Sequence, residues 1–155
     1  MGCTSKEYRS AVGTEVLKIF MEKVTIDAAK TKKGYSCVCS LLPGWVVAYE
    51  GDFDGFRQYV AESIAFRIES AREDGEDYPD AFNGEYLLEY KFDVHSLLEA
   101  YRGIFSFSAL QKITGINQKQ LSHYAAGISK PRRVQADKIA RGLHKLADEL
   151  RSITL

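Results

Sequence analysis

Apolar and polar residues alternate between residues 22 and 50, as they do in strands that bury one face. Val24 and Ile26, for example, fall on the same face of the first expected strand. Two turns, at residues 31–34 and 41–44, separate this strand from a second and a third. Consecutive strands joined by such short turns predict an antiparallel meander.

The apolar spacing becomes helical after Gly51. Apolar residues then recur at intervals of four, four, four and three: Phe56, Val60, Ile64, Ile68 and Ala71. This stripe predicts one helix, capped by Asp52 or Asp54 and running to about Asp74, that covers one face of the sheet. An acidic loop follows at residues 73–85, and alternation returns in residues 86–95, where we expect another strand.

From about residue 96 onward the spacing stays helical. Four helices are expected: residues 96–101, a helix capped by Ser106 or Ser108 that stops at Gly115, residues 118–126 between Asn117 and Gly127, and residues 135–152. The predicted fold class is therefore α+β, with a small antiparallel sheet and one covering helix in residues 21–95 and an all-α domain in residues 96–155. Residues 1–20 form an N-terminal extension, for which disorder and a mis-assigned start are both open interpretations.

Charge separates the two expected domains, although the whole chain is neutral. Residues 106–155 contain nine Lys and Arg against three Asp and Glu, whereas residues 50–105 contain fourteen acidic residues against five basic ones. A basic C-terminal part and an acidic N-terminal part indicate different binding partners.

Several classes of protein are not indicated by the sequence. It contains neither a secretory signal nor an apolar run long enough to cross a bilayer, so we expect a cytoplasmic protein without a membrane partner. Cys3, Cys37 and Cys39 form no CxxC pair, which favours free buried thiols over a zinc site. No phosphate-binding loop or catalytic triad is recognisable, so we expect no enzyme, cofactor or metal.

One alternative to this non-enzymatic interpretation stays open. Asp27, Glu50 and Asp52, together with Asp54, are candidates for a metal-binding carboxylate cluster in a residual nuclease. Helix capping by Asp52 or Asp54 is the simpler explanation of two of them.

The segment Gly-Ile-Asn at residues 115–117 joins two short expected helices, which is typical of a helix-turn-helix. Apolar residues are spaced to lock the two helices together: Leu110, Ile113, Ile116, Leu121 and Tyr124. The opposite face of the second helix carries side chains suited to reading bases: Gln118, Lys119, Ser122 and His123. Further polar or cationic residues are suited to contacting the DNA backbone: Asn117, Gln120, Lys130, Arg132 and Arg133. An ordinary solvated helix is the alternative interpretation of the same face.

A longer pattern runs through residues 107–150. Its fixed positions are Leu110, Thr114-Gly115-Ile116, Leu121-Ser122-His123-Tyr124, Gly127, Pro131, Ile139-Ala140 and Leu143. This pattern resembles the phage-repressor-type (XRE-like) helix-turn-helix domain. In that family the start of the second helix enters the major groove, which implies that role here for Gln118, Lys119, Ser122 and His123.

The N-terminal part carries a second set of motifs: Leu42-Pro43-Gly44, a short strand at residues 45–50, Gly51-Asp52, a helix from Asp54, and Glu89-Tyr90-Lys91-Phe92-Asp93 with Leu97-Leu98. Together they resemble the HicB-type antitoxins, which carry a truncated RNase H-like domain, often followed by a DNA-binding domain. The sequence departs from that pattern at three places: Ser40-Leu41, Phe53 and Gly55-Phe56. The resemblance implies a partial RNase H-like fold for residues 21–95 and a HicA-like, RNA-cleaving toxin as its partner.

The last expected helix carries an apolar stripe of its own: Ile139, Leu143, Leu146, Leu150 and Ile153. We expect the stripe to pack in part on the helix-turn-helix core and in part on a second copy, giving a homodimer or a higher oligomer. The leading hypothesis is an antitoxin of a type II toxin–antitoxin system that neutralises its toxin and represses its own operon. A stand-alone transcriptional regulator, whose N-terminal domain dimerises or senses a ligand, is the alternative.

Overall fold

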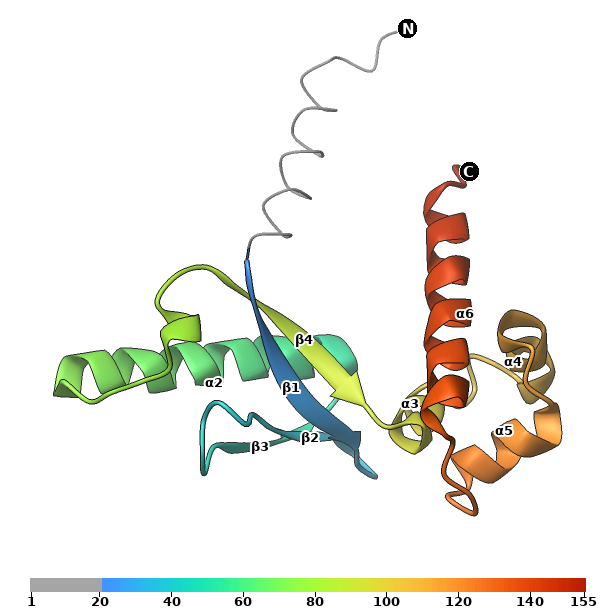
Figure 1. The fold of residues 1–155 in the computed structure, drawn as a ribbon, viewed down its shortest axis with the longest axis horizontal. Helices are drawn as coiled ribbons and strands as arrows, with labels where there is room; N and C mark the ends of the chain where they lie inside the picture. Colours follow the sequence, from blue (N-terminus) through green and yellow to red (C-terminus); the bar gives the residue numbers. More distant parts are fainter. Residues whose placement is uncertain (1–20) are drawn as a thin grey trace, which may run out of the picture. The chain divides into compact units, whose positions relative to one another are not determined.

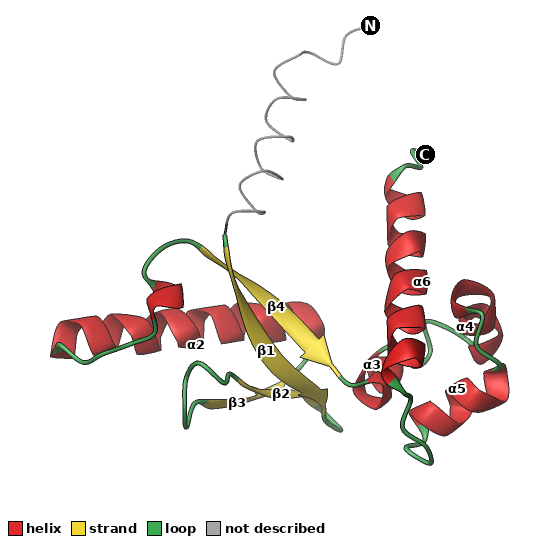
Figure 2. Ribbon diagram, viewed as in Figure 1, coloured by secondary structure: helices red, strands yellow, loops and turns green. Residues whose placement is uncertain are grey.

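The computed structural model describes residues 21–155, and in them the chain forms two compact units (Figure 1). Unit 1 comprises residues 21–28 and 32–91, and unit 2 comprises residues 29–31 and 92–155. The sequence instead placed the boundary between residues 95 and 96. Strands occur in the first part of the chain and helices alone follow them, so helices and strands are both present, as expected (Figure 2).

A four-stranded sheet forms the base of unit 1. Its strands are β1 (Glu22–Lys30), β2 (Gly34–Val38), β3 (Val46–Glu50) and β4 (Tyr86–Phe92), in the order β3-β2-β1-β4. β2 and β3 pair in antiparallel fashion, with Gly34 opposite Glu50 and Val38 opposite Val46.

β4 lies beside β1, and the arrows of these two strands point the same way (Figure 2). The sheet is therefore mixed, and the expectation of an antiparallel sheet is wrong at this edge. The physical reason is the long helix between β3 and β4, because such a crossover returns the chain to the far edge in a parallel direction. On the solvent side, Lys23 pairs with Glu89 at 2.7 Å and Lys91 with Asp27 at 3.9 Å.

One helix, α2 (Phe53–Asp74), covers the other face of the sheet. The expected stripe is its buried side: Phe56, Val60, Ile64, Ile68 and Ala71. Asp52 caps its first turn, since Oδ1 accepts a hydrogen bond from the Gly55 N–H at 2.8 Å. Gly75 ends it with a φ of 68°, a left-handed conformation that favours glycine. The prediction of this helix from its apolar spacing is confirmed.

The strand expected over residues 86–95 ends earlier, at Phe92. Asp93 terminates it, because its Oδ1 accepts a hydrogen bond from the Ser96 N–H at 2.6 Å and so caps α3 (Val94–Ala100). The helix expected at residues 96–101 therefore begins two residues sooner.

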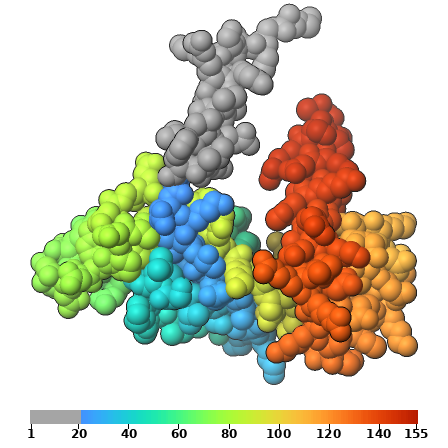
Figure 3. Space-filling model, viewed as in Figure 1, coloured from blue at the N-terminus to red at the C-terminus, as the bar shows by residue number. Residues whose placement is uncertain are grey.

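Unit 2 contains three further helices: α4 (Phe107–Thr114), α5 (Gln118–Ala125) and α6 (Arg133–Arg151). α6 starts two residues before the predicted Gln135. The buried core of the unit draws on all of its helices: Val94, Leu98, Leu110, Ile116, Leu121, Tyr124, Ala125 and Ile139. The C-terminal turns of α6 extend beyond α4 and α5 (Figure 3). None of the helices in residues 21–155 combines the length and apolar content that crossing a bilayer requires.

Candidate nucleic-acid interface

The connection between α4 and α5 is a tight, fixed turn. Gly115 adopts a φ of 72° and donates its N–H to Gln111 O at 2.8 Å, which ends α4. The Thr114 hydroxyl donates to Leu110 O at 2.7 Å and accepts from the Ile116 N–H at 3.2 Å. With Ile116 buried beneath it, this turn fixes the direction in which α5 leaves.

Two side chains satisfy the first amides of α5. Asn117 Oδ1 accepts from the Lys119 N–H at 2.8 Å, so Asn117 is the N-cap, as the sequence predicted. Gln111, on α4, accepts from the Gln118 N–H through its Oε1 at 3.1 Å. This bond joins the two helices at the point where α5 begins.

Gln111 was absent from the sequence prediction. It lies seven residues before Gln118, and no local spacing rule joins residues on two different helices. The only available signal was its place on the exposed side of α4, which many surface glutamines share.

α5 buries one side and exposes the other. Leu121, Tyr124 and Ala125 are buried, as Leu121 and Tyr124 were expected to be. The four residues predicted to read bases lie away from that side, with Gln118 and Lys119 exposed and Ser122 and His123 half-buried. Gln118 and Lys119, in the first turn, therefore present the most accessible hydrogen-bonding groups of the set.

The residues predicted to contact the DNA backbone lie at both ends of α5 and in the segment that follows. All five are exposed: Asn117, Gln120, Lys130, Arg132 and Arg133. Within residues 21–155, the ion pairs involve none of the cations Lys119, Lys130, Arg132 and Arg133. These positive charges are therefore available to an external anion.

The N-terminus of α6 adds to this positive region. Arg132 is its N-cap and makes no side-chain capping bond, and its first turn has no acidic residue. A helix N-terminus carries partial positive charge, so the helix end and the two arginines would together attract an anion bound there. A phosphate group has the charge and the oxygen acceptors that this arrangement lacks.

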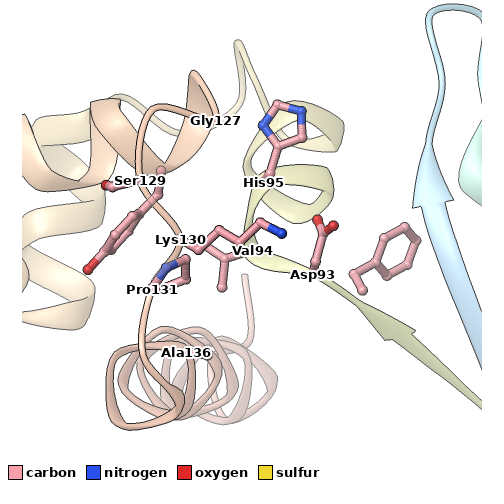
Figure 4. Close-up of a pocket in the computed structure, with 10 residues that line it drawn as sticks. Asp93, Val94, His95, Gly127, Ser129, Lys130, Pro131 and Ala136 are labelled. Carbon is pink, nitrogen blue, oxygen red and sulfur yellow. The ribbon is translucent and has the colours of Figure 1, made fainter.

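Unit 2 also contains a pocket of about 400 Å³ (Figure 4). Its lining residues come from the end of β4, the start of α3, α5, the α5–α6 connection and the first turns of α6: Phe92, Asp93, Val94, His95, Tyr124, Gly127, Ser129, Lys130, Pro131 and Ala136. The sequence did not predict it, because a cavity arises from packing between distant segments.

The carboxylates considered as a metal cluster have separate structural roles. Asp52 caps α2, Glu50 faces Lys33 at 3.6 Å, and Asp27 faces Lys91 at 3.9 Å. Asp54 lies 4.0 Å from Arg57. Within residues 21–155, no three histidine, cysteine or carboxylate side chains are arranged to hold a metal ion.

Cys37 and Cys39 are both buried and unbonded to another sulfur, whereas Cys3 lies outside the described residues. Burial, together with the neighbouring Cys39, raises the pKa of the Cys37 thiol to about 12. A thiol with so high a pKa is a poor nucleophile at neutral pH.

No protein-family model matches the chain, and searches of curated proteins and of solved structures also gave no match.

Proposed function

We propose that unit 2 is a helix-turn-helix domain of the phage-repressor type that binds double-stranded DNA, with α5 in the major groove. The observation that carries the proposal is the α4–α5 pair itself. Its glycine turn, its shared buried side and its Gln111–Gln118 bond hold an exposed Gln-Lys pair at the start of a rigid helix. Glutamine suits adenine and lysine suits guanine in the major groove.

The segment between α5 and α6 supports the same proposal. Lys130, Arg132 and Arg133 follow α5 directly, and no carboxylate of residues 21–155 pairs with them. Backbone contacts of this kind set the register of a protein on DNA and make its affinity depend on salt.

The test separates base reading from backbone binding. We expect Gln118→Ala and Lys119→Ala to cost roughly 1–3 kcal/mol on the selected operator and to relax sequence preference. Arg132→Ala and Arg133→Ala should weaken binding to all sequences alike and reduce the salt dependence. Operators are first selected from random DNA, and gel-shift titrations then measure each affinity. Lys112→Ala, an exposed lysine on α4, is the control. Unchanged operator affinity for Gln118→Ala would show that α5 does not read the bases.

We further propose that the whole chain is a cytoplasmic antitoxin of the HicB type, which represses its own operon through unit 2 and neutralises a HicA-like, RNA-cleaving toxin through unit 1. An RNA-binding toxin is cationic, so its partner surface is expected to be acidic. The segment at residues 73–85, which comprises the last two residues of α2 and the acidic loop after them, supports this, because it contains six acidic residues and no basic one.

That acidic loop is held in place rather than loosely attached. Phe82 is buried, the Arg72 guanidinium donates to Tyr78 Oη at 2.9 Å and to Phe82 O at 3.1 Å, and Asn83 donates to Asp80 at 3.0 Å. A fixed array of carboxylates loses less conformational entropy on binding than a disordered one.

Co-expression tests the antitoxin proposal. The toxin candidate is a short neighbouring reading frame that encodes a small basic protein, and we expect the chain to restore growth in cells that express it and to co-purify with it. A triple variant, Glu76→Gln, Asp77→Asn and Asp80→Asn, should weaken rescue, whereas Glu22→Gln on β1 should not. If the wild-type chain neither rescues growth nor forms a complex, while unit 2 still binds DNA, the chain acts as a stand-alone regulator.

A further inference from the structure

The pocket of Figure 4 lies entirely within unit 2 and has mainly apolar walls. Phe92, Val94, Tyr124, Pro131 and Ala136 contribute these walls. Its volume of about 400 Å³ is within the range of small-molecule sites. The proposed DNA-reading face of α5 does not use it, since of the base-reading and backbone-contacting residues only Lys130 lines it.

A cation and an anion line the pocket together. Figure 4 shows the Lys130 side chain extending from the α5–α6 connection with its nitrogen directed towards the side that Asp93 occupies. Within residues 21–155, neither residue takes part in an ion pair. Asp93 uses Oδ1 to cap α3, which fixes the carboxylate in position.

His95 and Ser129 also line the pocket. His95 Nδ1 lies 2.8 Å from Ala125 O, and because a carbonyl only accepts, Nδ1 carries the hydrogen and Nε2 remains an acceptor in the neutral ring. The Ser129 hydroxyl oxygen is buried and has no hydrogen-bond partner among the described residues. Because this oxygen is buried, it is not accessible to a molecule in the pocket.

We infer that this pocket binds a small zwitterion with an apolar side chain, of the chemical class of a free apolar α-amino acid. Its carboxylate meets Lys130, its ammonium group meets Asp93, and its side chain lies against Val94, Tyr124 and Ala136. A ligand with a carboxylate alone would be repelled by the Asp93 carboxylate, and a ligand with an amine alone would be repelled by the Lys130 ammonium group. Only a molecule with both charges matches both residues.

A consequence for DNA binding rests on the proposed function. Lys130 is also one of the cations expected to meet the DNA backbone, so a ligand carboxylate paired with it removes one phosphate contact. We expect a saturating ligand to weaken operator binding by about tenfold, equivalent to a loss of about 1.4 kcal/mol.

The experiment measures ligand binding to the full chain without DNA, by isothermal titration calorimetry. L-phenylalanine is the first probe, followed by L-leucine and L-tryptophan. 3-Phenylpropionate, which lacks the ammonium group, and phenethylamine, which lacks the carboxylate, are the matched comparisons. We expect at least one of the three amino acids to bind and each matched phenyl analogue to bind about tenfold more weakly than phenylalanine.

Two variants assign the charges. Lys130→Met keeps the apolar stem and should abolish the preference for phenylalanine over phenethylamine. Asp93→Asn keeps an oxygen to cap α3 and should abolish the preference over 3-phenylpropionate. Lys112→Met, on α4 and outside the pocket, should change neither preference. Circular dichroism verifies that each variant is folded.

The inference is overturned if none of the three amino acids binds at millimolar concentration, or if binding is unaffected by both Lys130→Met and Asp93→Asn. Operator binding is measured in a separate titration. If the chain binds phenylalanine but no DNA, this site stands and the proposed function is refuted. If the chain binds DNA but no amino acid, the proposed function stands and this site is refuted.

Discussion

Gly142 lies where α6 closely approaches the backbone of α4. A Cβ atom at this position would stand 2.5 Å from Ile113 O, a backbone atom that cannot move without shifting α4. We expect Gly142→Ala to destabilise unit 2 by about 1–3 kcal/mol, the usual cost of overpacking. Urea denaturation followed by circular dichroism measures the change. Gly84→Ala, where a Cβ meets nothing within 4 Å, is the control and should change stability by less than about 0.5 kcal/mol. Equal effects of the two substitutions would contradict this close approach.

Two groups of unit 1, the buried Cys37 thiol and the half-buried Tyr90 phenol, make its stability depend on alkaline pH. Burial raises the pKa of Cys37 from 9.0 to about 12, and it raises that of Tyr90 from 10.0 to about 12. The unfolded chain releases these protons at a lower pH than the folded unit does. The stability that they contribute is therefore complete below pH 9 and is lost as the pH rises towards 12.

Variants isolate these two groups from the lysines and other tyrosines that titrate in the same range. We expect the urea midpoint of the wild type to fall from pH 9 upward, and to fall less steeply in Cys37→Ala and in Tyr90→Phe. Tyr59→Phe, at an exposed site on α2, should retain the wild-type slope. If the urea midpoint falls with pH as steeply in Cys37→Ala and in Tyr90→Phe as in the wild type, neither group titrates as described.

At the scale of elements, the start of α5 depends on one side chain. We expect Asn117→Ala to lower the stability of unit 2 by roughly 0.5–2 kcal/mol, because the Lys119 N–H loses its acceptor. Asn117→Asp keeps an acceptor at the same place and should remain close to the wild type. Thermal and urea denaturation curves, recorded by circular dichroism, compare the three proteins. If Asn117→Asp is as unstable as Asn117→Ala, the effect does not come from the cap.

Helices whose signals are local were predictable from the sequence. The stripe from Phe56 to Ala71 specified α2, and Asn117 marked the first turn of α5, because periodicity and capping act within a few residues. The end of β4 was not predictable in the same way. Its alternation continues past Phe92, but the capping bond that the Ser96 N–H donates to Asp93 Oδ1 ends the strand.

Features that depend on contacts between distant segments could not be predicted from local patterns in the sequence. The place of β4 beside β1 depends on the path of α2, and local alternation is the same in parallel and antiparallel edge strands. The residues at the candidate DNA interface were all named from the sequence except Gln111, whose bond to Gln118 joins two helices. The pocket lined by Asp93, His95 and Lys130 also forms between segments that are distant in the sequence, so local patterns do not indicate it.

At the scale of the whole molecule, the two units divide the charge as well as the fold. Unit 1, counted over residues 21–28 and 32–91, carries fourteen acidic residues against seven basic ones, and unit 2 carries eleven basic against five acidic. Surfaces of opposite charge let one chain attract a cationic protein with one part and a polyanion with the other. The neutral total therefore conceals the property on which both proposed interactions depend.

The apolar stripe of α6 predicts how two copies of the chain meet. Ile139 is fully buried and Leu143 packs against the core, whereas Leu150 and Ile153 are 58% and 59% exposed. Ile139 and Leu143 are thus used within unit 2, whereas Leu150 and Ile153, at the C-terminal end of the stripe, remain exposed. Fully burying a leucine or an isoleucine contributes about 1.5–3 kcal/mol, so a two-fold contact through these residues favours a dimer.

We expect sedimentation analysis to give a dimer for the wild type, and Leu150→Glu with Ile153→Glu to give a monomer, because paired apolar side chains would become facing carboxylates. Ala140→Glu, at an exposed position of the same helix, should remain dimeric. The monomer should lose affinity for an operator with two half-sites but keep the wild-type affinity for a single half-site, since α5 is unchanged. A wild-type monomer at micromolar concentration would rule out this contact. A double variant that stays dimeric would place the dimer interface elsewhere on the chain.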